Sequence, residues 1–294
     1  MRILVADATG AVGRLMVPLL VEAGHEVTGL VRTDGLRDLL RTFGASAVRG
    51  DALDADGVRA AVAAVAPDVV IHQLTALARG GPADNGRIRR EGTRVLVDAA
   101  RRAGVGRIIA QSVAWAYEPG DGPATEDTPL DVTAPRPRAS LVGGVTALEE
   151  AVAEVEEHVV LRYGVLYGPG TWYTPGGLVG ERLAGRAEDD PAAVFLGPLQ
   201  ADDGVSSFVH VEDAARAAVA ALDWPSGVVN IVDDTPARAR EWLPVLARAL
   251  GVPAPSARHG REGWERGASN ARARGELGWC PAHPSWRTGF PAMR

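Results

Sequence analysis

A glycine-containing turn between a strand and a helix, at the start of the chain, constrains the fold more than any other feature. Residues 1–6 are apolar and rich in β-formers, residues 7–14 are mostly small, and residues 15–21 continue with helical spacing. Such a strand, turn and helix open a dinucleotide-binding βαβ unit, in which the amides and dipole at the helix start face a pyrophosphate. The sequence therefore predicts a nucleotide site on this turn.

One position of the turn departs from the expected pattern. Counting back from Gly13 and Gly10, the first glycine of G-x-x-G-x-x-G should stand at position 7, where the chain has Asp7. A Cβ and a negative charge there would oppose a pyrophosphate by roughly a few kcal/mol if unscreened. If Asp7 instead points away and caps the turn, the affinity for a dinucleotide falls but binding survives.

Strand and helix patterns alternate along the chain, which predicts a doubly wound parallel α/β sheet of the Rossmann type. Strands are expected at 1–6, 26–31, 45–49, 68–72, 107–111, 159–163, 206–211 and 228–232, helices at 15–21, 36–43, 55–65, 87–103, 147–157, 212–222 and 238–250, and a loop at 118–137. The expected dinucleotide-binding domain is 1–166, with 209–235 returning to it. A small C-terminal α/β substrate lobe takes 167–208 and 236–294.

Composition excludes several classes of protein. No apolar run approaches the ~20 residues that span a bilayer, and no signal peptide is visible, so the expectation is a cytoplasmic protein with no membrane partner. The single cysteine, Cys280, excludes an internal disulfide, and the scattered histidines and net charge of −6 argue against a metal site and a nucleic-acid partner. All 31 basic residues are arginine, which removes any mechanism that needs a lysine amine.

Residues that follow the second and third predicted strands suit the adenosine half of a dinucleotide. Arg32 stands where an NAD-preferring site would show Asp or Glu, so NADP is favoured, with NAD as the alternative. Asp51 is placed to accept from the adenine amino group. Each has a plainer interpretation, a solvated arginine and a helix cap. The expected cofactor-binding residues are Asp7, Thr9, Gly10, Ala11, Val12, Gly13, Arg32, Asp51, Ala52, Leu53, Leu74, Thr75 and Ser112.

These motifs, with several that follow, resemble the extended short-chain dehydrogenases/reductases of the NAD-dependent epimerase/dehydratase family. The resemblance spans nearly the whole chain and is carried by residues 8–13, 50–54, 68–72, 91–93, 161–170, 207–213 and 276–281. It implies a nicotinamide cofactor, a small-molecule substrate in the C-terminal lobe, and a homodimer as one possible assembly.

The resemblance also implies a Ser or Thr after the fifth strand and a Tyr-x-x-x-Lys pair on the next helix. Ser112 matches the first position, but alignment on Glu149 puts Leu141 and Val145 at the pair. The standard acid–base apparatus is therefore absent. Its function could have moved to Tyr117 or Tyr167, which with Ser112 are the expected catalytic residues.

Other candidates have weaker support from the sequence. Tyr173 lies on the same segment as Tyr167, Arg136 or Arg138 could supply the positive charge of the missing lysine, and His210 has a usable pKa.

Three functions fit the sequence. The first is an NADP-preferring oxidoreductase acting on a small, fairly apolar carbonyl or hydroxyl compound, since Trp115 and Trp172 suggest an aromatic pocket and Val205 stands where sugar-nucleotide enzymes carry an arginine. The second is a non-redox lyase, isomerase or cyclase with a structural cofactor or none, because Asp7 could have displaced it. The third is a non-enzymatic NADP-binding sensor.

Overall fold

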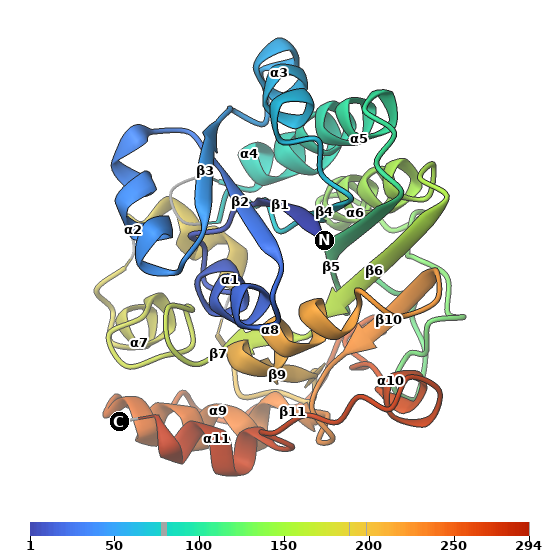
Figure 1. Cartoon of the computed structure of the whole chain (residues 1–294). Helices are drawn as coiled ribbons and strands as arrows, with labels where there is room; N and C mark the ends of the chain where they lie inside the picture. The colour runs from blue at the N-terminus through green and yellow to red at the C-terminus, as the bar shows by residue number, and fades with distance from the viewer. Residues whose placement is uncertain (78–80, 188, 198, 294) are drawn as a thin grey trace.

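Seven parallel strands form the central sheet of the computed structural model, which describes residues 1–77, 81–187, 189–197 and 199–293 (Figure 1). The strand order is β10-β6-β5-β4-β1-β2-β3. These strands are β1 (Arg2–Ala6), β2 (Glu26–Val31), β3 (Ser46–Arg49), β4 (Val69–His72), β5 (Arg107–Val113), β6 (Glu157–Tyr163) and β10 (Gly227–Ile231). The order reverses between β1 and β4, and ligands bind such sheets at the carboxyl ends of the strands beside this point. The predicted doubly wound fold is confirmed.

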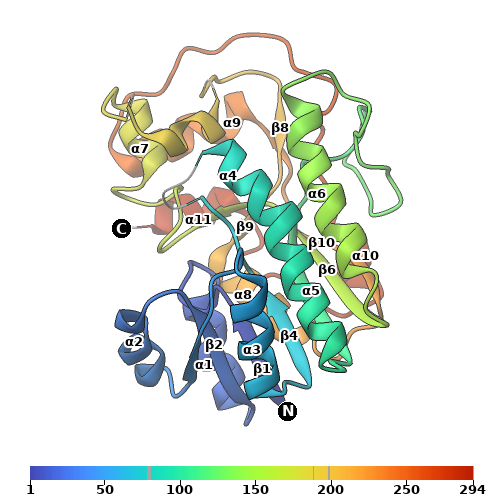
Figure 2. The ribbon, with the colours of Figure 1, turned by 90° about the horizontal axis from the view of Figure 1, so that it is seen from above.

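Helices cover both faces of the sheet. On one face pack α1 (Gly13–Glu22) and α8 (Val211–Ala220), and on the other α3 (Ala55–Val65), α5 (Thr93–Arg102) and α6 (Arg138–Val152). Figure 2 shows α5 and α6 side by side above the sheet. Each face buries an apolar cluster, and the centres of the strands are apolar, as expected for parallel strands covered on both sides. Beside β2 and β3 lie η1 (Asp34–Leu36) and α2 (Arg37–Thr42). None of the described helices is long and apolar enough to cross a membrane.

Beyond β6 the chain builds a third apolar cluster on two short sheets. β7 (Val165–Tyr167) pairs with β9 (Phe208–His210), and β8 (Val205–Ser206) pairs with β11 (Ala237–Arg238). Around them lie α7 (Leu178–Leu183), η3 (Pro191–Leu196), α9 (Ala239–Leu250) and α11 (Trp286–Ala292), whereas α10 (Ala271–Gly275) lies beside β10 of the central sheet. Trp286 and Phe290 of α11 are fully buried with Phe208 of β9, and α11 runs along α9 (Figure 1).

Two predicted helices have different bounds in the structure. The helix predicted at 147–157 begins at Arg138 and ends at Val152. The prediction missed its first half because Gly143 and Gly144 weaken the helical signal there. A Cβ at Gly144 would lie at an ordinary contact distance, 3.7 Å, from the Gly86 Cα. The helix predicted at 87–103 is divided into α4 (Pro82–Arg87), a π-helical turn η2 (Ile88–Gly92) and α5.

The remaining differences concern strand ends. β5 continues to Val113, so that Ser112 lies within the strand and not after it. The strand predicted at 206–211 is split into β8 and β9, and its last residue already belongs to α8.

Candidate active site

The turn between β1 and α1 has the tight geometry that a pyrophosphate site requires. The Gly10 amide donates to the Asp7 carbonyl over 3.2 Å, and a Cβ on Gly13 would collide with the backbone of Asp7 and Ala8. The residue that precedes α1 is Val12, and no side chain caps the helix there. The start of α1 therefore presents uncapped amides, which suit an anion.

Asp7 does not point away from this turn. Its backbone is left-handed (φ 70°), and its carboxylate lies against the Cα of Gly10. Burial raises the pKa of Asp7 to about 7, although the positive charges of Arg32 and Arg14 act to lower it. The glycines and the helix start fit a dinucleotide, and the Asp7 carboxylate, when charged, is the one misfit. Protonation near neutral pH would remove that misfit.

A surface pocket of about 630 Å³ lies beyond β2 and β3, and Arg32, Arg49 and Asp51 are among its lining residues. The two arginines stand at neighbouring strand ends, since Val31 pairs with Arg49. Asp51 accepts from the Leu53 amide over 3.0 Å, which holds a turn around the buried Ala52. The cap of α3 is Asp54, which accepts from the Gly57 amide, so the cap interpretation of Asp51 is wrong.

Leu74 and Thr75 follow β4 at the same end of the sheet. The Leu74 amide donates to His72 Nδ1 over 3.1 Å, and the Gln111 side chain donates to the Leu74 carbonyl. These bonds fix the segment where the resemblance places contacts to the cofactor.

Ser112 is held by an ion pair between β6 and α6. Its hydroxyl donates to Glu149 Oε1 over 2.6 Å, and Arg162 donates two hydrogen bonds to the same carboxylate, over 2.9 and 2.6 Å. All three side chains are at least largely buried. Burial acts to lower the pKa of Arg162, but the hydrogen bonds and charge of Glu149 raise it overall. The Ser112 proton is therefore directed at protein and not at open space.

Leu141 and Val145 replace the Tyr and Lys of the pair with apolar side chains, and the surroundings of Val145 are apolar as well. Val145 is 1% exposed and packs with Val142 and Ala116, against the partly buried Trp115. An ionised lysine would be costly in this cluster.

The two tyrosines expected to be catalytic are both buried. Tyr117 is 1% exposed and donates to Asn230 Oδ1 over 2.5 Å, and burial raises the pKa of its phenol to about 12. Tyr167 is fully buried against Phe208 and Phe290, and burial raises its pKa further. In this structure neither phenol is placed or tuned for proton transfer.

The other candidates from the sequence either bind neighbouring residues of the protein or lie away from Ser112. Arg138 donates to Asp131 and to the carbonyls of Trp115 and Tyr117, whereas Arg136 is exposed. Tyr173 packs on Phe208 and Trp242, and Trp172 lines a separate pocket of about 540 Å³ near α7.

Sequence reasoning missed Arg89, which lies in the π-helical turn and is only 8% exposed. Burial lowers its pKa to about 10, partly offset by the charge of Glu149. The sequence offered no signal for it, because residues 87–94 contain four arginines and only this one is buried.

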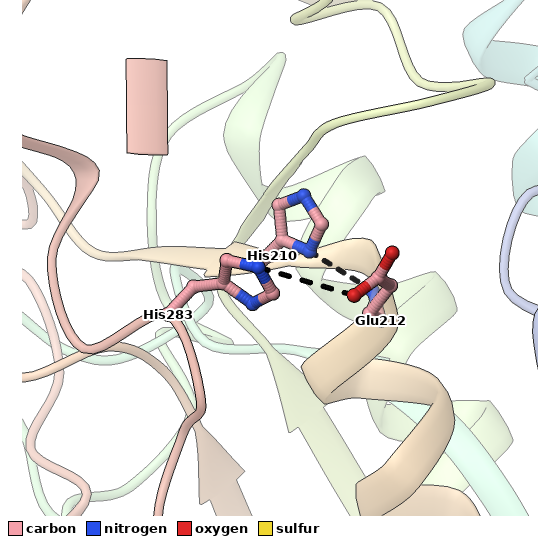
Figure 3. Close-up of side chains that lie close together, drawn as sticks. All are labelled: His210, Glu212 and His283. Atoms are coloured by element: carbon pink, nitrogen blue, oxygen red, sulfur yellow. Dashed lines mark hydrogen bonds and ion pairs between the residues drawn. The ribbon is translucent and has the colours of Figure 1, made fainter. Parts of the chain in front are cut away.

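His210, Glu212 and His283 lie close together at the start of α8 (Figure 3). The imidazoles of His210 and His283 are stacked with ring centres 3.8 Å apart, so their in-plane lone pairs do not converge on one ion. His210 Nδ1 also accepts from the Glu212 amide, and His283 lies against the buried Asp213. The cluster joins the C-terminal segment to α8.

Comparison with known proteins places the chain in a family. Residues 3–232 match the model of the NAD dependent epimerase/dehydratase family. A "3-diazoavenalumate denitrifying reductase" of Streptomyces sp is 45% identical, over 99% of each chain. The UDP-glucose 4-epimerase of Streptomyces lividans is 30% identical, over 95% of this chain and 91% of its own.

Solved structures agree on the fold. The Thermus thermophilus UDP-glucose 4-epimerase in complex with NAD superposes with a TM-score of 0.72 at 25% identity, over 100% of this chain and 97% of the other. The Bordetella bronchiseptica enzyme WbmG in complex with NAD and UDP gives 0.77 at 22% identity, over 99% and 93%. The protein is therefore an enzyme of nicotinamide-dependent oxidoreductase or epimerase type. It belongs to the NAD dependent epimerase/dehydratase family.

Proposed function

We propose that the enzyme is an NADP-preferring reductase that removes the nitrogen of a small carboxylate bearing a diazo or diazonium group. The apolar replacement of the Tyr–Lys pair, with Val145 1% exposed, carries the proposal. Carbonyl reduction or epimerisation at a hydroxyl needs a group that gives or takes the oxygen-bound proton. Among the described residues near Ser112, the hydroxyl of Ser112 itself is committed to Glu149 and Tyr117 is buried on Asn230. The site thus suits an electrophile that needs no such relay.

An organic diazonium ion is such an electrophile. A bound reduced nicotinamide supplies a hydride. Its addition to the terminal nitrogen turns R–N≡N⁺ into the neutral diazene R–N=NH. Loss of N₂ then breaks the C–N and N–H bonds, and the hydrogen passes from nitrogen to carbon to give R–H. The two electrons of the hydride reduce the substrate, and no alkoxide forms that would need a proton. The 45% identical reductase, whose name describes a diazo-bearing carboxylate and the removal of nitrogen, supports this chemistry.

The residues of this chain would bind and orient the reactants. The start of α1 and Gly10 would hold the pyrophosphate. Arg32 and Arg49, which line one pocket, suit a 2′-phosphate, and this is our reason for preferring NADP. Ser112, fixed by Glu149, would position the reacting groups at the end of β5. The lobe formed by 167–208 and 236–294 would receive the substrate.

The test is turnover of a ¹⁵N-labelled carboxybenzenediazonium with NADPH deuterated on the transferring face. We expect enzyme-dependent ¹⁵N₂ and deuterated benzoate, above the background reaction of the reagents with heat-denatured protein. Wild-type protein without added NADPH serves as the control for dependence on the cofactor. Reduction of ketones or aldehydes with no enzyme-dependent release of N₂ would overturn the proposal in favour of a carbonyl substrate. Cofactor preference is read from the ratio of NADPH to NADH affinities, which Arg32→Glu should reverse.

A further inference from the structure

Arg89 is a buried cation whose charge is unbalanced by its surroundings. Its side chain is 8% exposed, and it makes no hydrogen bond or ion pair with any residue that the structure describes. It projects from the π-helical turn η2, and such turns occur frequently at functional sites.

The nearest carboxylate cannot neutralise both cations around it. Glu149 acts on the pKa of Arg89, but its oxygens already accept two hydrogen bonds from Arg162 and one from Ser112. Two guanidinium groups therefore share one negative charge. A buried ion without its own partner is destabilising, so the fold retains here a charge that it does not satisfy.

His72 does not neutralise the positive charge of Arg89 either. Its Nδ1 accepts from the Leu74 amide, so its Nε2 carries the proton and donates to Thr93 Oγ1 over 2.8 Å. Burial, together with the charge of Arg89, lowers the pKa of His72 to about 4. The imidazole is thus a neutral neighbour, and the cluster formed by Arg89, Glu149 and Arg162 keeps a net charge of about +1.

The position of Arg89 connects this charge with the reaction site. A Cβ on Gly144 would lie 3.8 Å from the Arg89 Cβ, so Arg89 flanks the turn of α6 that carries Val145. Its ionic neighbour Glu149 holds Ser112 at the carboxyl end of β5. This is the end of a parallel sheet at which ligands bind.

We propose that Arg89 binds the carboxylate of the substrate and selects anionic over neutral compounds. A planar guanidinium can take a carboxylate with two parallel hydrogen bonds, and a site with little water strengthens that pair. The identity of the substrate as a diazo carboxylate rests on the proposed function, whereas the selection of a carboxylate by Arg89 does not.

Binding of cinnamate and of its neutral amide, cinnamamide, to the NADP⁺-loaded protein tests the proposal, because neither compound undergoes reduction of a diazo group. Isothermal calorimetry should show cinnamate bound at least tenfold more tightly by the wild type. Arg89→Gln should abolish the difference, and Arg89→Lys should keep part of it. Arg102→Gln removes the same charge from an exposed residue at the end of α5 and should behave as the wild type. Equal affinities in the wild type, no binding of cinnamate, or an unchanged preference in Arg89→Gln would each overturn the proposal.

Thermal unfolding separates a ligand-binding role from a structural one. Removal of an unbalanced buried charge should leave the melting temperature of Arg89→Gln equal to or above that of the wild type. A clear fall would mean that Arg89 stabilises the fold, and would contradict the proposal. Failure to reduce diazonium salts, with an Arg89-dependent preference for cinnamate, would sink the proposed function alone. Diazonium reduction with an unchanged KM in Arg89→Gln would sink the role of Arg89 alone.

Discussion

The Ser112 hydroxyl donates a hydrogen bond to Glu149 Oε1 over 2.6 Å. This serine therefore has its acceptor inside the protein, whereas in a carbonyl reductase the hydroxyl would donate to the substrate. We therefore expect Ser112→Ala to lower kcat by less than about tenfold. Loss of a donor that stabilises a developing oxyanion costs roughly 10²–10³ in kcat. Steady-state kinetics will distinguish a small loss of kcat from a large one. The control is Ser140→Ala, which changes an exposed serine at the start of α6. A loss of the larger size would show that Ser112 turns to the substrate during the reaction.

Glu149→Gln should strongly destabilise the protein. It leaves Arg162 buried without a counter-charge beside Arg89, and breaking a buried ion pair in this way costs about 3–5 kcal/mol. Calorimetry should show a fall in the melting temperature of several degrees. Glu154→Gln removes a carboxylate that pairs with Arg94 and Arg101 at the surface, and should change it very little. Similar melting temperatures for the two variants would mean that the Arg162–Glu149 pair contributes no more than a surface one.

Asp7 should make cofactor binding depend on pH. Because the pKa of Asp7 is about 7, its carboxyl is mostly neutral at pH 6 and charged at pH 8. The dissociation constant for NADPH, measured by fluorescence, should rise about tenfold between these values, or about 1.4 kcal/mol. In Asp7→Asn this part of the pH dependence should vanish. An identical profile for wild type and variant would show that the carboxylate does not face the pyrophosphate.

The same carboxyl should also affect folding. Its pKa is higher in the folded protein than in the unfolded chain, so the folded state holds more protons between about pH 4 and 7. The free energy of unfolding therefore falls as the pH rises through that window. Asp7→Asn should raise the melting temperature more at pH 8 than at pH 4. An equal effect at both values would contradict a raised pKa.

The two buried tyrosines should respond differently to loss of their hydroxyl groups. Tyr117→Phe leaves the amide oxygen of Asn230 without its donor, and this should cost about 1–3 kcal/mol of stability. The Tyr167 hydroxyl is buried with no hydrogen-bond partner among the described residues, so Tyr167→Phe should be neutral or stabilising. Neither variant should change kcat more than a few-fold. A large loss of kcat with an unchanged fold would restore that tyrosine as a catalytic residue.

Much of the fold could be predicted because its signals are local. The apolar strands and the turn at Gly10 and Gly13 are contiguous in the sequence, and they alone indicate a Rossmann sheet. The start of α6 was missed because Gly143 and Gly144, near its beginning, lack helical propensity.

The site was harder to predict because its contacts join distant segments. The bonds among Ser112, Glu149 and Arg162 link three elements, and the stacking of His283 on His210 spans 73 positions. Arg89 differs from its neighbours only in burial, which depends on how the π-helical turn rotates the helix and not on any local pattern.

The burial of α11 has a consequence for the order in which this protein can form during synthesis. Trp286 and Phe290 complete the cluster around Phe208, yet they leave the ribosome after all seven strands of the central sheet. Until then, Phe208 and Tyr167 would lack their apolar cover, while β1 to β6 and their helices could already have assembled. A nascent chain paused before Trp286 should therefore expose an apolar aromatic surface on an otherwise folded domain. We expect chaperones to bind the chain at this stage.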